Sequence, residues 1–261
     1  MTAYSRSREG KLDDIMTILG STGPVFVPGW NATGSNVGAL GIAAGFTVSD
    51  ESGAVNLEDE YSPVAFPSGL YHYGFVTALN HNFSTADAAG HSFGDGTEDE
   101  PFSVGLILRP HTVGTAMDLV CKYVAVTEEY KLAMTNAGLV FLELHDASAS
   151  ASWIATADTA LEVGKFHFIV ATYDGAETDP EIHLYVNGSD YNAAGTATES
   201  GTYTAMENTA TPLQIGAGGL TAAPTLEVAG RLAFPFITGK ELSATEVGEL
   251  TGIVFGLAGI A

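Results

Sequence analysis

A series of short alternating segments in the second half of the chain limits the fold more than any other sequence feature. Phe102, Val104, Leu106 and Leu108 recur at every second position, and Pro110 ends the run. Successive side chains of an extended strand point to opposite faces of a sheet, so this alternation is typical of a strand with one face in a core. Proline ends such a run because it cannot donate a hydrogen bond to the sheet.

Further strands follow at short intervals. Residues 165–174 are apolar on both faces, which predicts a central strand. Residues 181–188 alternate and end in an Asn187-Gly188 turn, and Asn136-Ala-Gly138 predicts a hairpin between two other short strands. Closely spaced strands of this kind predict antiparallel pairing in a sandwich.

Seven short motifs then occur in one order over roughly residues 90–250. They are Phe102-Ser-Val104, Val120-Cys-Lys-Tyr123, Tyr130-Lys-Leu132, Ala171-Thr-Tyr-Asp-Gly175, Ile182-His-Leu-Tyr-Val-Asn-Gly188, Leu213-Gln-Ile-Gly216 and Leu242-Ser-Ala-Thr-Glu246. Their order and spacing resemble the laminin-G-like, concanavalin A-like jelly-roll family. The resemblance implies an all-β protein, a two-sheet antiparallel jelly-roll sandwich with a short N-terminal arm and one short C-terminal helix.

The ends of the chain differ from its body. We expect an arm or short helix over residues 1–19, the sandwich over residues 20–249, and an apolar tail over residues 250–261. Residues 20–100 either complete the sandwich or form a separate lobe, and we favour completion because a jelly roll needs N-terminal strands to close its second sheet. A capping box at Ser243-Ala-Thr-Glu246 predicts the start of the C-terminal helix.

The charge of the chain is strongly acidic. It contains 31 Asp and Glu against 9 Lys and Arg, a formal net charge of -22, while Arg6, Arg8 and Lys11 gather near the N-terminus. An acidic body repels phosphate backbones and anionic lipid, so we expect neither a nucleic acid nor a membrane as partner. The first residues contain no apolar stretch of the kind found in a secretory signal.

No catalytic motif is found in the sequence. Carboxylates at the alternating spacing used by the related glucanases are missing, so we expect no enzyme activity and no obligatory cofactor. Calcium is the one ion that the sequence could hold, because family members often bind it in rim loops and carboxylate oxygens suit it. The candidate ligands are Asp95, Asp174 and Asp179; ordinary turn aspartates are the alternative. Cys121, the one cysteine, is expected to be a buried, inert thiol.

Three functions remain, and a degenerate glycoside hydrolase is the least favoured of them. The first is a non-catalytic structural protein on a virion surface, such as a capsid decoration protein, which binds capsid or other virion proteins, or further copies of itself, through its ends. The contact residues expected there are Arg6, Arg8, Lys11, Ile253, Val254, Phe255 and Leu257. The alternative is an extracellular carbohydrate- or adhesion-binding module that binds surface glycans. If both ends instead fold back onto the sandwich, the terminal residues serve the chain's own packing.

Overall fold

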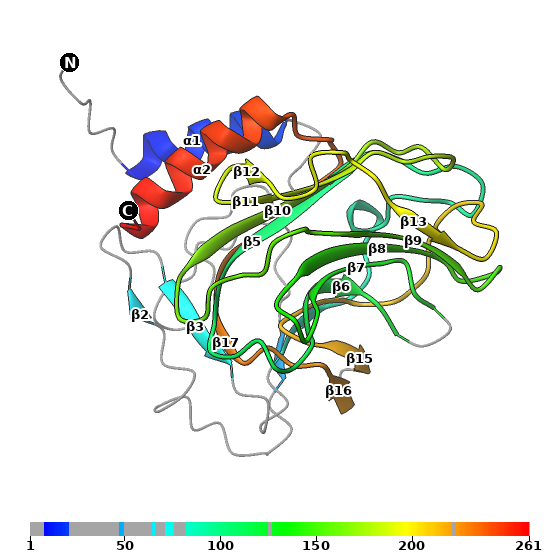
Figure 1. Ribbon diagram of the computed structural model, residues 1–261, viewed down its shortest axis with the longest axis horizontal. Coiled ribbons are helices and arrows are strands. Elements are labelled where there is room, and N and C mark those ends of the chain that lie inside the picture. Colours follow the sequence, from blue (N-terminus) through cyan, green and yellow to red (C-terminus); the bar gives the residue numbers. More distant parts are fainter. Residues whose placement is uncertain are drawn as a thin grey trace.

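The protein is a two-layered β-sandwich with a pair of helices on one outer side (Figure 1). The computed structural model describes residues 8–20, 47–49, 64–65, 71–75, 82–124, 127–220 and 223–260. All strand pairs in these ranges are antiparallel. The two-sheet antiparallel sandwich with a short C-terminal helix, as predicted from the sequence, is confirmed.

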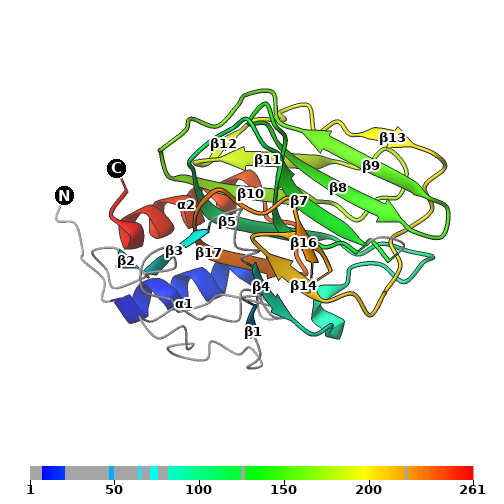
Figure 2. The ribbon, with the colours of Figure 1, turned by 90° about the horizontal axis from the view of Figure 1, so that it is seen from below.

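The first sheet joins eight of the described strands. Their order is β1 (Thr47–Ser49), β4 (Asn82–Thr85), β14 (Leu213–Ile215), β6 (Met117–Lys122), β7 (Tyr130–Met134), β8 (Val140–Asp146), β9 (Ala151–Thr156) and β13 (Thr198–Ser200). A hairpin of β15 (Gly218–Leu220) and β16 (Ala223–Thr225) follows β14 along the chain, and Figure 2 labels β14 and β16 beside each other. A one-turn 3-10 helix, η2 (Ala89–His91), comes between β4 and the next long strand.

The second sheet joins seven described strands. Their order is β12 (Ser189–Asp190), β11 (Ile182–Val186), β10 (His167–Tyr173), β5 (Phe102–Pro110), β17 (Gly230–Thr238), β3 (Tyr71–Phe75) and β2 (Val64–Ala65). β3 pairs with β17 while β4 pairs with β14, so the N-terminal part of the chain supplies strands to both sheets.

The core between the sheets follows from the alternation. Val104, Leu106 and Leu108 of β5 are fully buried and belong to the same cluster as Leu132 of β7 and Leu142 of β8. Burying an aliphatic side chain of this size contributes about 1.5–3 kcal/mol, so this interior supplies much of the stability of the fold.

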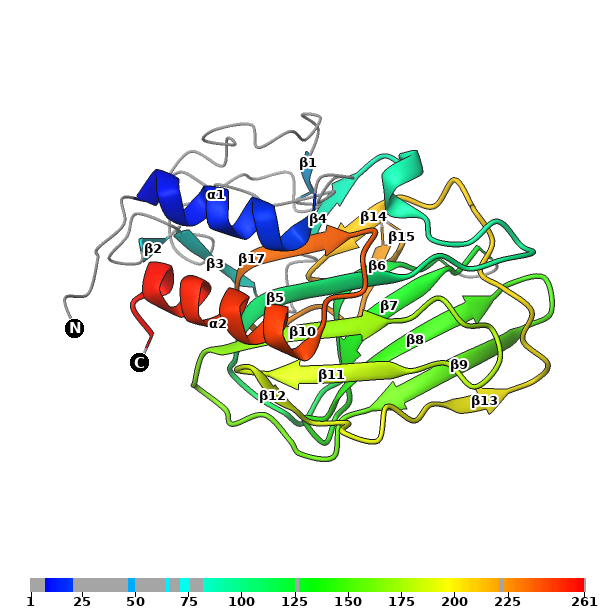
Figure 3. The same cartoon turned by 90° about the horizontal axis from the view of Figure 1, so that it is seen from above.

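The second sheet is also covered on its outer face. Ile107, Phe168 and Phe236 point away from the interior and pack under two helices, α1 (Arg8–Leu19) and α2 (Ala244–Ala258). Figure 3 shows the two helices side by side over this sheet. Every residue of β10 is buried, which confirms the central strand predicted from its two apolar faces.

Helix α2 begins where the sequence predicts. The Ser243 side chain accepts a hydrogen bond from the backbone N–H of Glu246, and the Glu246 side chain accepts one from the backbone of Ser243. The helix ends at Gly259, whose positive φ of 65° suits a residue without a side chain.

The apolar segment expected as a tail is most of this helix. Val247, Leu250, Val254 and Leu257 form a stripe at helical spacing, and all four are buried against the second sheet. This placement corrects the expectation that Val254 and Leu257 are free for contacts with a partner. The segment contains three glycines, which are poor helix formers, and its composition therefore does not indicate a helix.

The N-terminal arm is a docked helix over its described residues. Ile15 and Leu19 are fully buried in the cluster beneath α2. Two hydrogen bonds fix its end: Thr238 Oγ1 donates to the Leu19 carbonyl oxygen at 2.6 Å, and Lys240 Nζ donates to the Ile18 carbonyl oxygen at 3.1 Å. Both described ends therefore pack on the sandwich. Neither described helix has the length and apolar character that a membrane-spanning helix requires.

The helix layer is expected to unfold together with the sandwich. Leu250→Ala should lower the free energy of unfolding by about 2–5 kcal/mol, since the cavity adds to the lost burial. Urea unfolding followed by circular dichroism measures this, and the exposed Thr245→Ala in the same helix should change stability by less than about 0.5 kcal/mol. A Leu250→Ala variant as stable as the parent would show that the layer does not contribute to the cooperative fold.

Candidate functional site

The outer face of the first sheet presents polar and aromatic side chains. Lys131 of β7 pairs in register with Glu143 of β8, and their neighbours Leu132 and Leu142 face the interior. Side chains alternate along a strand, so Lys131, Glu143 and His145 share the opposite face. We call this group, with Tyr123 and Phe141, the sheet-face patch.

The patch is held together by short contacts. Lys131 Nζ lies 2.8 Å from Glu143 Oε2, and His145 Nε2 lies 3.0 Å from Glu143 Oε1. The Lys131 ammonium also sits 4.1 Å from the centre of the Tyr123 ring, within cation–π range. The rings of Tyr123 and His145 meet edge to face at 5.1 Å between centres. Tyr123, Lys131, Phe141 and His145 are only partly buried, so they reach solvent in a fixed arrangement.

The Lys131–Glu143 pair is ionised at neutral pH. Burial raises the pKa of Glu143, but hydrogen bonds from His145 and Lys131 and the Lys131 charge outweigh burial and bring the pKa below its ordinary value. Burial lowers the pKa of Lys131, yet the hydrogen bond to Glu143 and the Glu143 charge outweigh it and raise the pKa above its ordinary value. The pair therefore offers fixed charges to a ligand.

A pocket adjoins the patch at His145. It has a volume of about 280 Å³ and is lined by Glu128, His145, Asp146, Ala147, Ser150, Ala151 and Ser152. Hydrogen bonds to two carboxylates fix the loop at residues 147–149, which lines this pocket. Asp146 Oδ1 accepts hydrogen bonds from Ser148 Oγ and the Ala149 N–H, and Glu207 accepts the N–H groups of Ala147 and Ser148. This volume lies just below the range of about 300–1,000 Å³ that is usual for small-ligand pockets.

A buried carboxyl group lies on the same face, beneath the β15–β16 hairpin. Asp118 is 2% exposed, and its Oδ1 has no hydrogen-bond partner among the described residues. Gly218 lies so close to the carboxyl group that no larger residue fits there without a shift. Burial raises the pKa of Asp118 to about 6, and the Lys131 charge offsets part of this rise. Cys121, beside it on β6, is a buried thiol whose Sγ donates to the Ala217 carbonyl oxygen.

A further charged cluster is internal. Lys122 Nζ, fully buried, lies 2.6 Å from Asp87 Oδ1, 2.7 Å from Ser92 Oγ and 3.0 Å from Glu129 Oε1. Burial, and then the Lys122 charge, lower the pKa of nearby His91 to about 4, so His91 is neutral. A buried ammonium needs such partners, and the cluster therefore serves the fold.

The three candidate calcium ligands have other roles. Asp95 Oδ1 accepts the N–H groups of Thr97 and Glu98, and Asp174 Oδ1 accepts the N–H of Ala176, so both carboxylates close their own turns. Asp179 is exposed in a turn with a φ of 52°. Within the described ranges, no three or more His, Cys, Asp and Glu side chains are grouped to hold a metal ion. The structure does not bring these three residues together as a calcium site.

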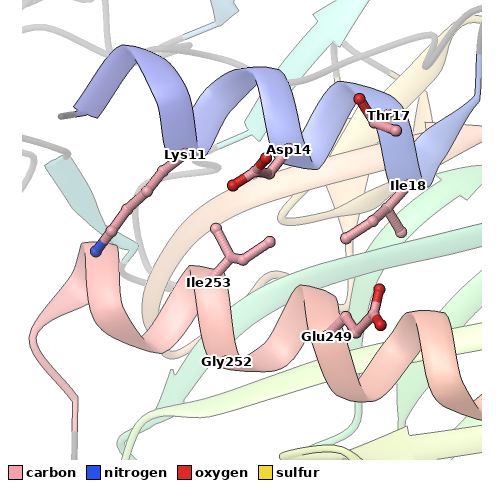
Figure 4. Close-up of a pocket in the computed structure, with 7 residues that line it drawn as sticks. All are labelled: Lys11, Asp14, Thr17, Ile18, Glu249, Gly252 and Ile253. Carbon is pink, nitrogen blue, oxygen red and sulfur yellow. The ribbon is translucent and has the colours of Figure 1, made fainter. Parts of the chain in front are cut away.

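The expected assembly residues fall into three groups. Val254 and Leu257 are buried, as described above, and Ile253 and Phe255 are partly buried at the edge of the same cluster. Lys11 lines an open groove between α1 and α2 (Figure 4). Arg6 lies outside the described residues, and Arg8 is described only as the first residue of α1.

The sheet-face patch is not among the residues predicted from sequence. Charged residues on a strand more often mark a solvated face, and a sequence does not show which of them meet. One sequence feature does indicate part of the patch. The Asn136-Ala-Gly138 hairpin fixes a register that places Lys131 opposite Glu143.

Comparison with family models matches residues 82–248 to a laminin-G-type model that is described as the concanavalin A-like lectin/glucanases superfamily. This range is well over half of the 261 residues. No curated protein matches the sequence.

Solved structures with a similar fold include binding domains of botulinum neurotoxins. The botulinum neurotoxin serotype G binding domain has a TM-score of 0.61 at 14% identity, over 89% of this chain and 51% of that one. The binding domain of botulinum neurotoxin DC in complex with SialylT gives 0.59 at 11% identity, over 90% and 52%. In complex with rat synaptotagmin II it gives 0.58 at 10% identity, over 88% and 51%. The chain spans about half the length of these domains, and the likeness shows the fold.

The buried Asp118 predicts a specific pH dependence of stability. Its pKa is about 6 in the folded chain against 3.8 when exposed, so the folded state holds the proton more tightly. The folded state therefore gains stability from holding the Asp118 proton. This gain is complete below about pH 4 and is lost as the pH rises through 6. Asp118→Asn should remove this dependence and stabilise the protein at pH 8 by up to a few kcal/mol, at about 1.4 kcal/mol per pKa unit.

Urea unfolding between pH 4 and 8 measures the effect, with the exposed Asp158→Asn as control. If Asp118→Asn and the parent show parallel stability curves across this range, Asp118 does not titrate with a raised pKa.

Proposed function

Because the chain belongs to the concanavalin A-like lectin/glucanases superfamily, we propose that it is a non-catalytic binding module that holds a glycan on the outer face of its first sheet. The observation that carries the proposal is the sheet-face patch: partly exposed aromatic rings beside an ordered Lys131–Glu143–His145 group, next to a pocket. Sugars present apolar ring faces and many hydroxyl groups, and such a surface offers rings and fixed hydrogen-bonding groups to match.

The arrangement of carboxyl groups favours binding over hydrolysis. A glycosidase needs an acid and a second carboxylate that both reach the scissile bond. Asp118 has the raised pKa of an acid, but it is buried beneath the hairpin. Glu143 is engaged by both Lys131 and His145. These two groups therefore support a surface that binds a sugar without cleaving it.

The charge of the chain narrows the ligand class. With a formal net charge of -22, the protein repels strongly acidic polysaccharides at a distance. Within the patch, Glu143 and Lys131 largely cancel each other's charge. A neutral, hydroxyl-rich oligosaccharide suits the site best, as part of a surface or extracellular glycan. The toxin binding domains offer a precedent for the fold as a binding scaffold, and the ligand here is argued from the patch alone.

A virion-surface role is the second candidate. The observation that favours it is the position of the two chain ends, which form neighbouring helices on the outside of the sandwich, with Arg8 and Lys11 on α1. Capsid or other virion proteins would be the partners, and Arg6 would add to the contact. A sedimentation profile separates the two roles: protein carried by intact particles supports the virion role, whereas free protein that binds a glycan supports the first proposal.

Substitutions in the patch should weaken glycan binding. We expect Tyr123→Ala and Lys131→Ala each to reduce affinity about tenfold for a neutral oligosaccharide found on a glycan array, because each removes a ligand contact of about 1.4 kcal/mol. Isothermal titration calorimetry measures the change, and thermal unfolding shows that the variants are folded.

Lys165→Ala is the matched control. Lys165 also pairs with a glutamate, Glu162, at 2.6 Å, but both side chains are well exposed and lie away from the patch. The proposal fails if the array gives no neutral glycan, or if both patch variants bind as tightly as the parent.

A further inference from the structure

A buried lysine lies between two carboxylates at one end of the first sheet. Lys122, the last residue of β6, is fully buried, and its Nζ lies 2.6 Å from Asp87 Oδ1 and 3.0 Å from Glu129 Oε1. Asp87 follows β4, and Glu129 directly precedes β7. Strands β4 and β6 lie on either side of β14. The contact between Lys122 and Asp87 therefore connects the two strands that flank β14.

The surroundings of this cluster are apolar and aromatic. Tyr130 pairs with Lys122 in register and is fully buried, and its ring centre lies 5.1 Å from that of Phe102. Phe93 stacks on Phe102 at 4.5 Å. Such surroundings disfavour charged groups and favour their neutral forms. The neutral forms of a lysine and an aspartate are an amine and a carboxylic acid, and these two groups can condense.

Glu129 has an unused oxygen in the same place. Its side chain is fully buried, and Oε1 accepts hydrogen bonds from the N–H and the Oγ1 of Thr209 at 2.7 Å each. Its Oε2 has no hydrogen-bond partner among the described residues. Burial raises the pKa of Glu129, and the Lys122 charge opposes part of the rise. A carboxylate that takes up and returns a proton near neutral pH is a suitable general base and acid.

The reacting atoms are within reach of each other. The carboxyl carbon of Asp87 is one bond of about 1.2 Å from Oδ1, so it lies within about 4 Å of Lys122 Nζ. A small shift brings this pair to the separation of about 3–3.5 Å at which bonds form. Ser92 Oγ at 2.7 Å and the Thr209 carbonyl oxygen at 3.3 Å hold Nζ in place. The Asp87 side chain is 28% exposed, so a released water molecule has a way out.

We propose that Lys122 and Asp87 condense to an intramolecular amide bond, with Glu129 as the catalytic proton carrier. Proton transfer within the ion pair gives an amine and a carboxylic acid. The lone pair of Nζ attacks the Asp87 carboxyl carbon, an N–C bond forms and a C–O bond breaks. Glu129 takes a proton from the nitrogen and passes it to the departing hydroxyl, which leaves as water.

The step balances without a cofactor or an oxidant. One ammonium and one carboxylate become one neutral amide and one water, and Glu129 returns to its starting state. The product removes two charges from a site where their desolvation is costly. It also closes a covalent loop from residue 87 to residue 122, which restrains the unfolded chain as a disulfide would.

Mass spectrometry of the intact, denatured full chain tests the proposal. We expect a mass lower than that of the sequence by one water, about 18 Da. Chymotrypsin cleaves after aromatic residues and should release residues 84–93 joined to the peptide that ends at Tyr123. Lys122→Arg and Asp87→Ala should each show no loss of water, because each removes one of the two reacting groups.

A third variant tests the role of Glu129. Glu129→Gln keeps an oxygen that accepts the hydrogen bonds of Thr209, so circular dichroism should show a folded protein. The amide should form at least about a hundredfold more slowly, because the proton carrier is missing. Lys131→Ala is the matched control: Lys131 also pairs with a glutamate, at 2.8 Å, but outside this cluster, and its loss should leave the water loss unchanged.

Three results would overturn the proposal or part of it. A folded parent chain that keeps its full sequence mass after several days at neutral pH shows that the amide does not form. Loss of water that persists in Lys122→Arg places the reaction elsewhere in the chain. A Glu129→Gln variant that loses water as fast as the parent removes Glu129 from the reaction.

Discussion

Burial of the second sheet on both faces is the constraint on which the rest of the structure depends. Strands β5, β10 and β17 place one set of apolar residues in the interior and another set, including Ile107, Phe168 and Phe236, on the outside. An outer face of this kind needs a cover, because exposing it would forgo a large share of the burial energy. The two ends of the chain supply that cover as α1 and α2. The helices are therefore part of the fold, although they lie at the ends of the chain.

This constraint also gives the two outer sides of the sandwich different roles. With the second sheet covered, the first sheet is the layer whose outer face can present ligand-binding groups on rigid strands. Lys131 and Glu143 sit on paired strands, so their geometry is set by the sheet register. The cost of ordering these side chains has already been met in the folded protein, which favours binding. The helix layer in turn carries an open groove between α1 and α2.

Much of the fold could be predicted from the sequence. Alternation identified β5, two-sided apolarity identified the central β10, and the Ser243–Glu246 capping box located the start of α2. These features are local, and each depends on a period or a turn that a sequence shows directly. The rest of α2 was missed because Gly248, Gly252 and Gly256 lower its helix propensity, while its stability comes from packing that a sequence does not show.

The candidate site could not be predicted in the same way. Tyr123, Lys131 and His145 become a group only when β6, β7 and β8 are in register. The aspartates chosen from turn motifs, Asp95 and Asp174, instead accept hydrogen bonds from their own loops. Acidic turn residues stabilise turns far more often than they bind ions, and the sequence alone did not separate the two roles.

The central claim is that the outer face of the first sheet binds the ligand. Mapping amide and side-chain chemical shifts by NMR during titration with a neutral oligosaccharide tests it most directly. The account predicts that the largest shift changes occur at Tyr123, Lys131, Glu143 and His145 and along the pocket residues up to Ser152. Changes centred on α1 and α2, with the first sheet unaffected, would contradict it.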